Sequence, residues 1–263
     1  MRLSALYRYP VKSLAGQLLQ QVQLDACGLA ADRRWMLVDR EGRFLSQREL
    51  PRMTLITPRL EPQGVFLQAP EMPGLGVPYP DEGAERIKVR VWDDTCMAQL
   101  GDDSAHAWLS DFLGMACRLV YMPEETVRPV DPDYALAQDR TAFADGFPLL
   151  LISQASLDDL NQRLAEPLPM LRFRPNLVVE GCAPYAEDEW RRIRIGELTL
   201  RVVKPCSRCK ITTVDPYTAE TGSEPLKTLA SYRRRGNQVY FGQNLLHDGI
   251  GELALGMPIE VLQ

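Results

Sequence analysis

Two cysteines, Cys206 and Cys209, lie three residues apart in a segment that also contains Lys204, Arg208 and Lys210. Cationic neighbours favour the thiolate form of a cysteine, and the thiolate is both the stronger nucleophile and the better metal ligand. This segment is therefore the first place to look for chemistry in the chain.

The neighbouring residues predict how the two cysteines are held. Residues 197–203 alternate apolar and polar side chains, which predicts a strand. Pro205 is expected to end that strand, and the β-branched residues 211–214 are expected to form the next one. The cysteines then lie on a loop between two strands, a common position for a site on a rigid scaffold.

Several kinds of chemistry fit a cysteine pair of this spacing. A closed zinc site needs four ligands, usually in two close pairs, but the other cysteines are scattered singly, as Cys27, Cys96, Cys117 and Cys182. A thioredoxin-like dithiol lies at the start of a helix, whereas β-prone residues follow here. The pair could also have no chemical role. The last alternative is a single thiolate that binds a soft metal centre beside an anionic cofactor, and the clustered positive charge favours it.

Composition narrows the class of protein. The chain has 263 residues, 45% hydrophobic and 25% charged, which is enough for one large domain or two smaller ones. Its net charge of −5 gives no electrostatic basis for binding nucleic acid. The charged start of the chain does not read as a signal peptide, and no apolar run is long enough to span a membrane. We therefore expect a cytoplasmic protein that does not enter a membrane.

Periodicity predicts a mostly β chain with a few helices, an α+β class. Helices are expected from Asp102 or Asp103 to Leu113, at 153–164 and at 225–234. The chain divides near 123–146, a segment of low periodicity, into expected domains 1–120 and 121–263. Strands are expected at 2–9, 17–24, 35–39, 43–46, 53–56, 65–68, 86–92, 117–121, 149–152, 173–180, 191–195, 197–203, 211–214, 239–241 and 259–262.

Basic clusters elsewhere in the chain could complete an anion-binding pocket. Lys12 precedes Ser13, Arg33 follows Asp32, and Arg174 lies two residues before Asn176. Guanidinium forks and amide groups recognise phosphates and the edges of heterocycles. These clusters are candidates for residues that face the cysteine segment.

Together these motifs carry a resemblance that covers nearly the whole chain. Residues 9–13 (Tyr-Pro-Val-Lys-Ser), Gly16 and residues 32–35 (Asp-Arg-Arg-Trp) resemble the N-terminal β-barrel domain that precedes MOSC domains. The MOSC domain itself is similar in residues 172–176 (Arg-Phe-Arg-Pro-Asn), 186–190, 206–216 and 241–244 (Phe-Gly-Gln-Asn). The chain thus resembles the family of bacterial YcbX-like proteins and mitochondrial amidoxime-reducing components.

The resemblance implies a fold, a cofactor and a set of site residues. It implies an N-terminal β-barrel-like domain and a MOSC-type β-barrel domain, with a molybdenum cofactor (Mo-molybdopterin) bound between them. Cys209 would be the molybdenum ligand and the catalytic residue, with Cys206 as support. Asn244 stands where mitochondrial relatives carry a tyrosine. The residues implied to hold the cofactor are Lys12, Ser13, Arg33, Asp145, Gly146, Arg174, Asn176, Ser207, Arg208, Cys209 and Asn244.

The resemblance also implies a reaction. The expected enzyme is a molybdenum-dependent reductase of N-hydroxylated bases, hydroxylamines and amidoximes that cleaves the N–O bond with two electrons. Some YcbX-like proteins carry an iron–sulfur domain, but this chain offers no matching cysteine set. A separate flavoprotein reductase, ferredoxin or cytochrome b5-like protein is therefore expected to supply the electrons. The alternative is a non-redox protein that carries sulfur as a persulfide on Cys209 or delivers the cofactor.

Overall fold

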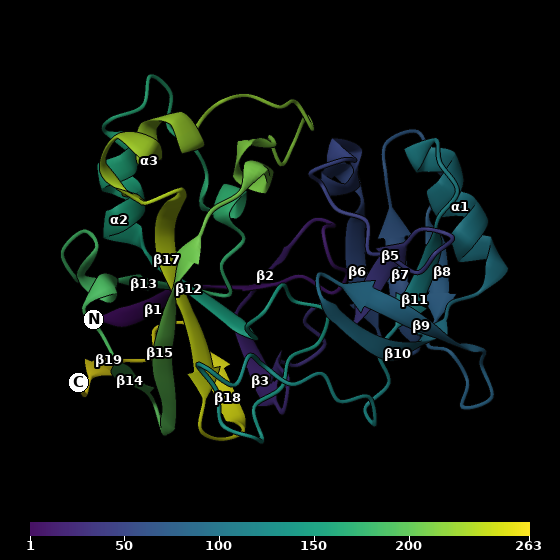
Figure 1. Cartoon of the computed structure of the whole chain (residues 1–263), viewed down its shortest axis with the longest axis horizontal. Helices are drawn as coiled ribbons and strands as arrows, with labels where there is room; N and C mark the ends of the chain where they lie inside the picture. Colours follow the sequence, from purple (N-terminus) through teal and green to yellow (C-terminus); the bar gives the residue numbers. More distant parts are fainter.

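The computed structural model describes residues 1–263 and contains nineteen strands and three α-helices, so the predicted mostly β class is confirmed. Two halves lie side by side along the longest axis (Figure 1). One half contains both chain ends together with α2 and α3, and the other contains α1. No helix is long and apolar enough to cross a membrane.

A nine-stranded sheet forms the half that contains the chain ends. Its last strand, β16 (Arg234–Arg235), pairs only with β17. The other strands follow the order β19 (Ile259–Val261), β14 (Arg192–Ile195), β15 (Leu198–Ser207), β17 (Gln238–His247), β12 (Leu149–Ser153), β13 (Leu177–Glu180), β1 (Arg2–Arg8) and β2 (Gln17–Leu19).

The start of the chain belongs to this sheet. Strand β1 pairs antiparallel with β13, with Arg2 opposite Glu180 and Leu6 opposite Leu177. Its side chains join a hydrophobic core with residues of β12 to β15. The first strand therefore packs with strands that follow the expected domain boundary at residue 120. The division into domains 1–120 and 121–263 stays a prediction.

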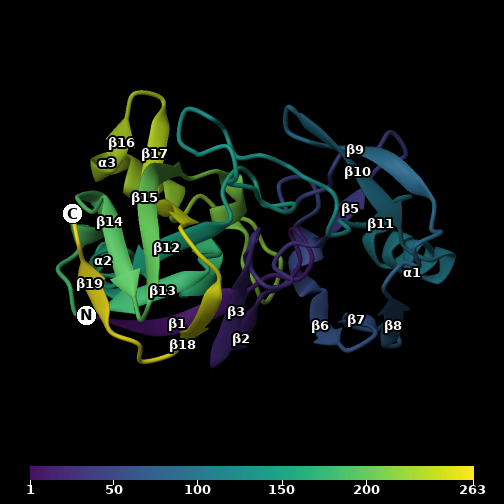
Figure 2. The same cartoon turned by 90° about the horizontal axis from the view of Figure 1, so that it is seen from below.

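Three smaller sheets complete the molecule (Figure 2). One of them, β18-β3-β4, packs on the core of the large sheet, and the other two surround a core that α1 covers. Their strands are β18 (Gly251–Ala254), β3 (Gln21–Asp25) and β4 (Gly28–Leu29); β5 (Trp35–Val38), β11 (Arg118–Tyr121), β10 (Asp94–Leu100) and β9 (Arg86–Val91); and β6 (Thr57–Glu61), β7 (Gly64–Gln68) and β8 (Leu75–Pro78).

The three predicted helices are present, and Asp102, one of the two expected starts of the first, caps α1. In α1 (Asp103–Leu113) the Asp102 carboxylate accepts the Ala105 N–H at 2.8 Å, and Gly114 ends the helix with φ 70°. In α2 (Gln154–Asn161) the Ser153 hydroxyl accepts the Ser156 N–H at 3.1 Å. The third helix, α3, spans Leu226–Tyr232.

Two predicted strands are short 3₁₀ helices instead. Residues 53–56 lie in the 3₁₀ helix Pro51–Leu55, where a proline at the first position favours a helical turn. Residues 211–214 overlap the 3₁₀ helix Lys210–Thr213. There the Thr212 and Thr213 hydroxyls donate to the carbonyls three residues earlier, which supports a turn against an extended strand.

The prediction that Pro205 ends its strand was also wrong, since β15 continues to Ser207. The pairing of β15 with β17 shifts register between Val202 and Lys204 and again between Pro205 and Ser207. Bulges of this kind accept a residue without an N–H donor. The prediction missed β4, β6, β8, β10, β16 and β18.

Candidate functional site

The predicted site residues converge on one pocket, called here the central pocket. All eleven line it, and they come from widely separated parts of the chain. Lys12, Ser13 and Arg33 precede residue 120, and the other eight follow it. The remaining lining residues are Ala144, Phe147, Leu150, Phe173, Cys206 and Ile211.

Each cysteine of the pair contacts its own arginine. Cys206 lies near the end of β15, and its Sγ accepts a hydrogen bond from Arg208 Nη1 at 3.0 Å. Cys209 is the residue before the 3₁₀ helix Lys210–Thr213, and its Sγ accepts from Arg48 Nη2 at 3.3 Å. The two sulfurs thus lie beside different cations on different elements, and both are free thiols.

A group of charged side chains around Asp145, the Asp145 cluster, lies next to Cys209. The Lys12 ammonium donates to the Phe143 carbonyl at 2.7 Å and pairs with Asp145, which Arg48 also approaches at 3.4 Å. Burial lowers the pKa of Lys12 to about 8, although Asp145 opposes that change. The Asp145 side chain is 54% exposed, and Lys12 and Arg48 lower its pKa against the effect of burial.

A second group of polar side chains, the Tyr9 cluster, is more deeply buried. The Arg33 and Arg174 guanidiniums lie 4.5 and 4.2 Å from the centre of the buried Tyr9 ring. Arg33 pairs with the buried Asp32, and its Nη1 donates to Asn176 Oδ1 at 3.2 Å. Burial lowers the pKa of Arg174 to about 10. Every member therefore has protein partners on at least two sides.

Backbone strain concentrates at the same pocket. Ser13, Arg33 and Arg174 have φ values of 66°, 49° and 54°, in the left-handed region that residues with a Cβ rarely adopt. Strained residues persist where the surrounding structure fixes them, and they cluster at functional sites. The fold thus keeps three of the predicted residues in costly conformations around one pocket.

Two functional candidates were missed in the sequence. Arg48 lies between β5 and the 3₁₀ helix Pro51–Leu55 and has no local motif that marks it. Arg128 is buried and donates to the carbonyls of Ala142, Ala144 and Asp145, which fixes the segment that carries Asp145. In the sequence, Arg128 is an isolated basic residue in the low-periodicity segment 123–146, and nothing there marks it as part of a site.

Two other residues near the cysteines have structural contacts. Asp215 pairs with Arg172 at 2.8 Å and accepts the Tyr217 and Thr218 N–H groups, as expected of an Asp-Pro turn. Asn244 Nδ2 donates to the Lys204 carbonyl at 3.2 Å while its side chain lines the central pocket.

The lining of the central pocket suits an anionic ligand with a soft metal. Its charged residues are four cations, Lys12, Arg33, Arg174 and Arg208, and one carboxylate, Asp145, in a protein of net charge −5. The buried atoms Arg174 Nη2 and Arg208 Nε have no hydrogen-bond partner. The free volume is about 130 Å³, below the roughly 300 Å³ of small-molecule pockets. A ligand of cofactor size therefore requires side chains to move, and Asp145 and Ser207 are the exposed residues of the lining.

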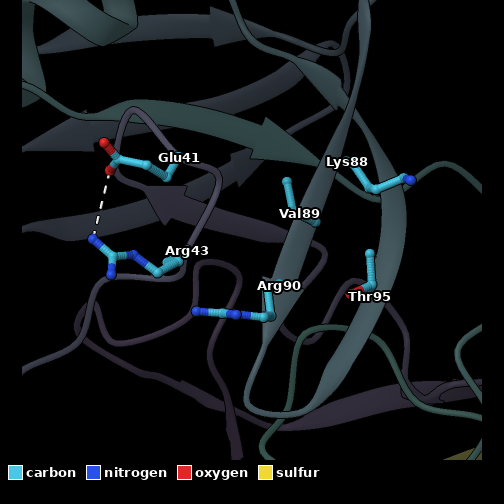
Figure 3. A pocket seen from close by; sticks show the side chains of 6 residues that line it. All are labelled: Glu41, Arg43, Lys88, Val89, Arg90 and Thr95. Carbon is cyan, nitrogen blue, oxygen red and sulfur yellow. Dashed lines mark ion pairs between the residues drawn. The ribbon is translucent and has the colours of Figure 1, made fainter.

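An open hollow elsewhere lacks these features. It lies over β9 and β10, and its lining includes one ion pair, Arg43 with Glu41 at 3.5 Å (Figure 3). No cysteine and no predicted site residue lines it, so we assign it no chemistry. Its lining residues are Glu41, Arg43, Lys88, Val89, Arg90 and Thr95.

Two family models match separate parts of the chain. Residues 1–116 match the MOSC N-terminal beta barrel domain, and residues 138–260 match the MOSC domain. The chain is 35% identical to mitochondrial amidoxime-reducing component 1 of Mus musculus, over 98% of this chain and 81% of the relative. The Homo sapiens protein of that name is 34% identical, over 98% and 82%.

A third relative has a different name. The molybdenum cofactor sulfurase of Oryza sativa is 32% identical over 96% of this chain but only 33% of its own length. The two amidoxime-reducing components, in contrast, match along most of their own length. The chain belongs to the MOSC-domain family that includes the mitochondrial amidoxime-reducing components.

Proposed function

We propose that this protein is a molybdenum-cofactor-dependent reductase of N-hydroxylated compounds. The observation that carries the proposal is the central pocket, where a cysteine and four cations from distant segments meet. The names of the full-length relatives support the reaction type. The reaction is R–NHOH + 2e⁻ + 2H⁺ → R–NH₂ + H₂O, with electrons from a separate flavoprotein, ferredoxin or cytochrome b5-like protein.

The residues of the pocket would divide the work of holding the cofactor. Molybdopterin carries a phosphate and an electron-rich dithiolene, which the cations of the lining can neutralise. When bound, the cofactor supplies the two-electron redox chemistry, with Cys209 as the protein ligand of the metal. Asn176 and Ser207 offer hydrogen-bonding groups, and Asp145 keeps the Lys12 ammonium oriented.

The test is a metal analysis joined to an activity assay. Protein purified from cells that make the cofactor should contain close to one molybdenum per chain and reduce benzamidoxime with reduced methyl viologen as donor. Cys209→Ala should lose both the metal and the activity. The matched control, Cys182→Ala, alters a cysteine outside the pocket and should keep both. Normal activity in Cys209→Ala would remove Cys209 from the mechanism.

A second candidate follows from the match to the rice sulfurase. In that case Cys209 would carry a persulfide or hold the cofactor for delivery, without reducing a substrate. Mass spectrometry of the purified protein separates the two proposals. A persulfide on Cys209 with no bound molybdenum would favour the carrier, and stoichiometric molybdenum with reductase activity would favour the enzyme.

A further inference from the structure

Arg48 lies at the edge of the central pocket, in contact with two of its lining residues, Cys209 and Asp145. Its side chain is 16% exposed, and its Nη2 lies 3.3 Å from Cys209 Sγ and 3.4 Å from Asp145 Oδ2. Its buried Nε has no hydrogen-bond partner. The Arg48 guanidinium thus reaches Cys209 Sγ from the other half of the molecule, and its Nε–H donates to no protein group.

Trp92 holds this guanidinium in place. The Arg48 guanidinium carbon lies 4.6 Å from the centre of the Trp92 ring, a distance typical of a cation–π contact. The Phe44 ring packs edge-on against Trp92 with ring centres 5.1 Å apart, which restricts the indole. The Arg48 side chain is therefore confined between the indole, the carboxylate and the sulfur.

The backbone at Trp92 is strained. Trp92 and Asp93 form a two-residue turn between β9 and β10, since Val91 and Asp94 are paired. The φ of Trp92 is 57°, in the left-handed region, where two-residue turns favour glycine or asparagine. A bulky residue in that conformation is unusual and indicates a function for the side chain.

We propose that Arg48 binds the oxygen of the substrate's N-hydroxyl group beside Cys209, and that Trp92 is the positioning residue that keeps Arg48 there. The inference rests on the proposed function. As two electrons enter and the N–O bond breaks, the oxygen gains negative charge; it keeps its own hydrogen and takes up one proton to leave as water, and the nitrogen takes up the second proton. A fixed guanidinium stabilises that charge by donating hydrogen bonds and stays protonated itself.

Lys12 is not equivalent to Arg48 in this respect. Its ammonium is buried and already donates to the Phe143 carbonyl and to Asp145. Arg48 also donates to protein groups, Ser46 Oγ, Asp145 Oδ2 and Cys209 Sγ, but these contacts are long, at 3.3–3.4 Å, and its Nε has no partner. The structure thus favours Arg48 over Lys12 as the group that meets the substrate.

The experiment measures kcat and KM for benzamidoxime, with reduced methyl viologen as donor, and the molybdenum content of each cofactor-loaded variant. Arg48→Gln should lower kcat/KM about 100-fold at unchanged molybdenum content. Trp92→Leu should lower kcat/KM about 10-fold, and Trp92→Phe should stay within about threefold because phenylalanine keeps a ring face for the guanidinium.

The matched control is Arg59→Gln. The Arg59 guanidinium also stacks on an aromatic ring, 4.9 Å from the centre of Phe66, but it lies outside the central pocket. Its loss should change kcat/KM by less than about twofold. A similar fall in both arginine variants would mean that general stability, and not contact with substrate, causes the effect.

Tryptophan fluorescence gives a readout that does not depend on turnover. Trp92 is 46% exposed, whereas Trp35, Trp108 and Trp190 are buried, none more than 8% exposed. Benzamidoxime that binds at Arg48 should therefore change the emission of Trp92 in the loaded enzyme without a donor. The change should disappear in Trp92→Phe, and Arg48→Gln should need at least tenfold more benzamidoxime to produce it.

The outcomes separate this inference from the proposed function. A wild-type protein without molybdenum or reductase activity refutes the proposed function, and the inference with it. An active wild type whose Arg48→Gln variant keeps its kcat/KM refutes the inference alone. A variant that loses molybdenum in proportion to activity also refutes it, because Arg48 would then bind the cofactor and not the substrate.

Discussion

The Tyr9 cluster and the Asp145 cluster line the same pocket but are built differently. In the Tyr9 cluster the carboxylate, Asp32, has a side chain only 2% exposed, whereas the carboxylate of the Asp145 cluster is 54% exposed. Cations of the first stack on a buried ring and donate to backbone carbonyls. The first cluster is therefore part of the core, and the second joins a buried cation, Lys12, to a half-exposed carboxylate at the pocket's edge.

The largest effect is expected from Asp32→Asn. This change leaves the Arg33 guanidinium, whose side chain is 12% exposed, without a counter-charge. Breaking a buried pair from one side costs roughly 3–5 kcal/mol of unfolding free energy. Urea unfolding of the cofactor-free protein measures it, and a loss below about 1 kcal/mol would show that the Tyr9 cluster is not a core element.

The next largest effect is expected in how the stability of the protein depends on pH through Lys12. Because burial lowers the pKa of Lys12 from 10.5 to about 8, the unfolded chain binds more protons than the folded chain between those values. The Lys12 contribution to unfolding free energy should then rise with pH over that window, by roughly 3 kcal/mol in all.

The comparison that isolates this effect is with Lys12→Met. The other titrating groups are shared, so they cancel when the two unfolding curves are subtracted. The difference in unfolding free energy should be flat below pH 8 and should grow in favour of wild type up to pH 10.5. Parallel curves throughout would mean that the ammonium is not confined as the structure describes.

A smaller effect is expected from Asn176→Leu in the Tyr9 cluster. The Asn176 side chain accepts the Leu150 N–H at 3.2 Å and donates to the Tyr7 carbonyl at 3.2 Å. Leucine has a similar size but leaves these backbone groups unpaired, which costs about 2 kcal/mol. Chemical denaturation checks the value, and an unchanged midpoint would contradict the role of Asn176 as a bridge between strands.

The smallest effect is expected from Asp145→Asn, the matched partner of Asp32→Asn. The half-exposed Asp145 lets water reach the pair, and the buried Lys12 ammonium keeps the Phe143 carbonyl as an acceptor, so the free energy of unfolding should fall by only about 1 kcal/mol. The same denaturation measurement applies. A loss as large as that of Asp32→Asn would erase the distinction between the two clusters.

Much of the fold followed from local signals. The alternation at 86–91 and the helix start at Asp102 are signals that act within a few residues, and the structure has the elements they predicted. Strand β10 was missed because residues 94–100 lack alternation. The extension of β15 past Pro205 was missed because bulges depend on the partner strand β17.

The site shows the same division between local and distant information. Lys12, Arg174 and Asn176 were found because motifs mark them, and the structure brings them together with the rest of the predicted set. Whether each binds a cofactor stays a prediction. Arg48 could not be found, because its partners Cys209 and Trp92 are distant in sequence and only the folded chain brings them near.

The pairing of β1 with β13 has a consequence for how the protein is made. Arg2 meets Glu180 only after most of the chain has left the ribosome, so the edge of β1 that pairs with β13 stays unpaired during most of synthesis, although β2 can pair with its other edge early. Lys12 and Ser13 follow β1 directly and face residues 207–209. An N-terminal fragment that ends before Ser207 therefore cannot assemble the pocket.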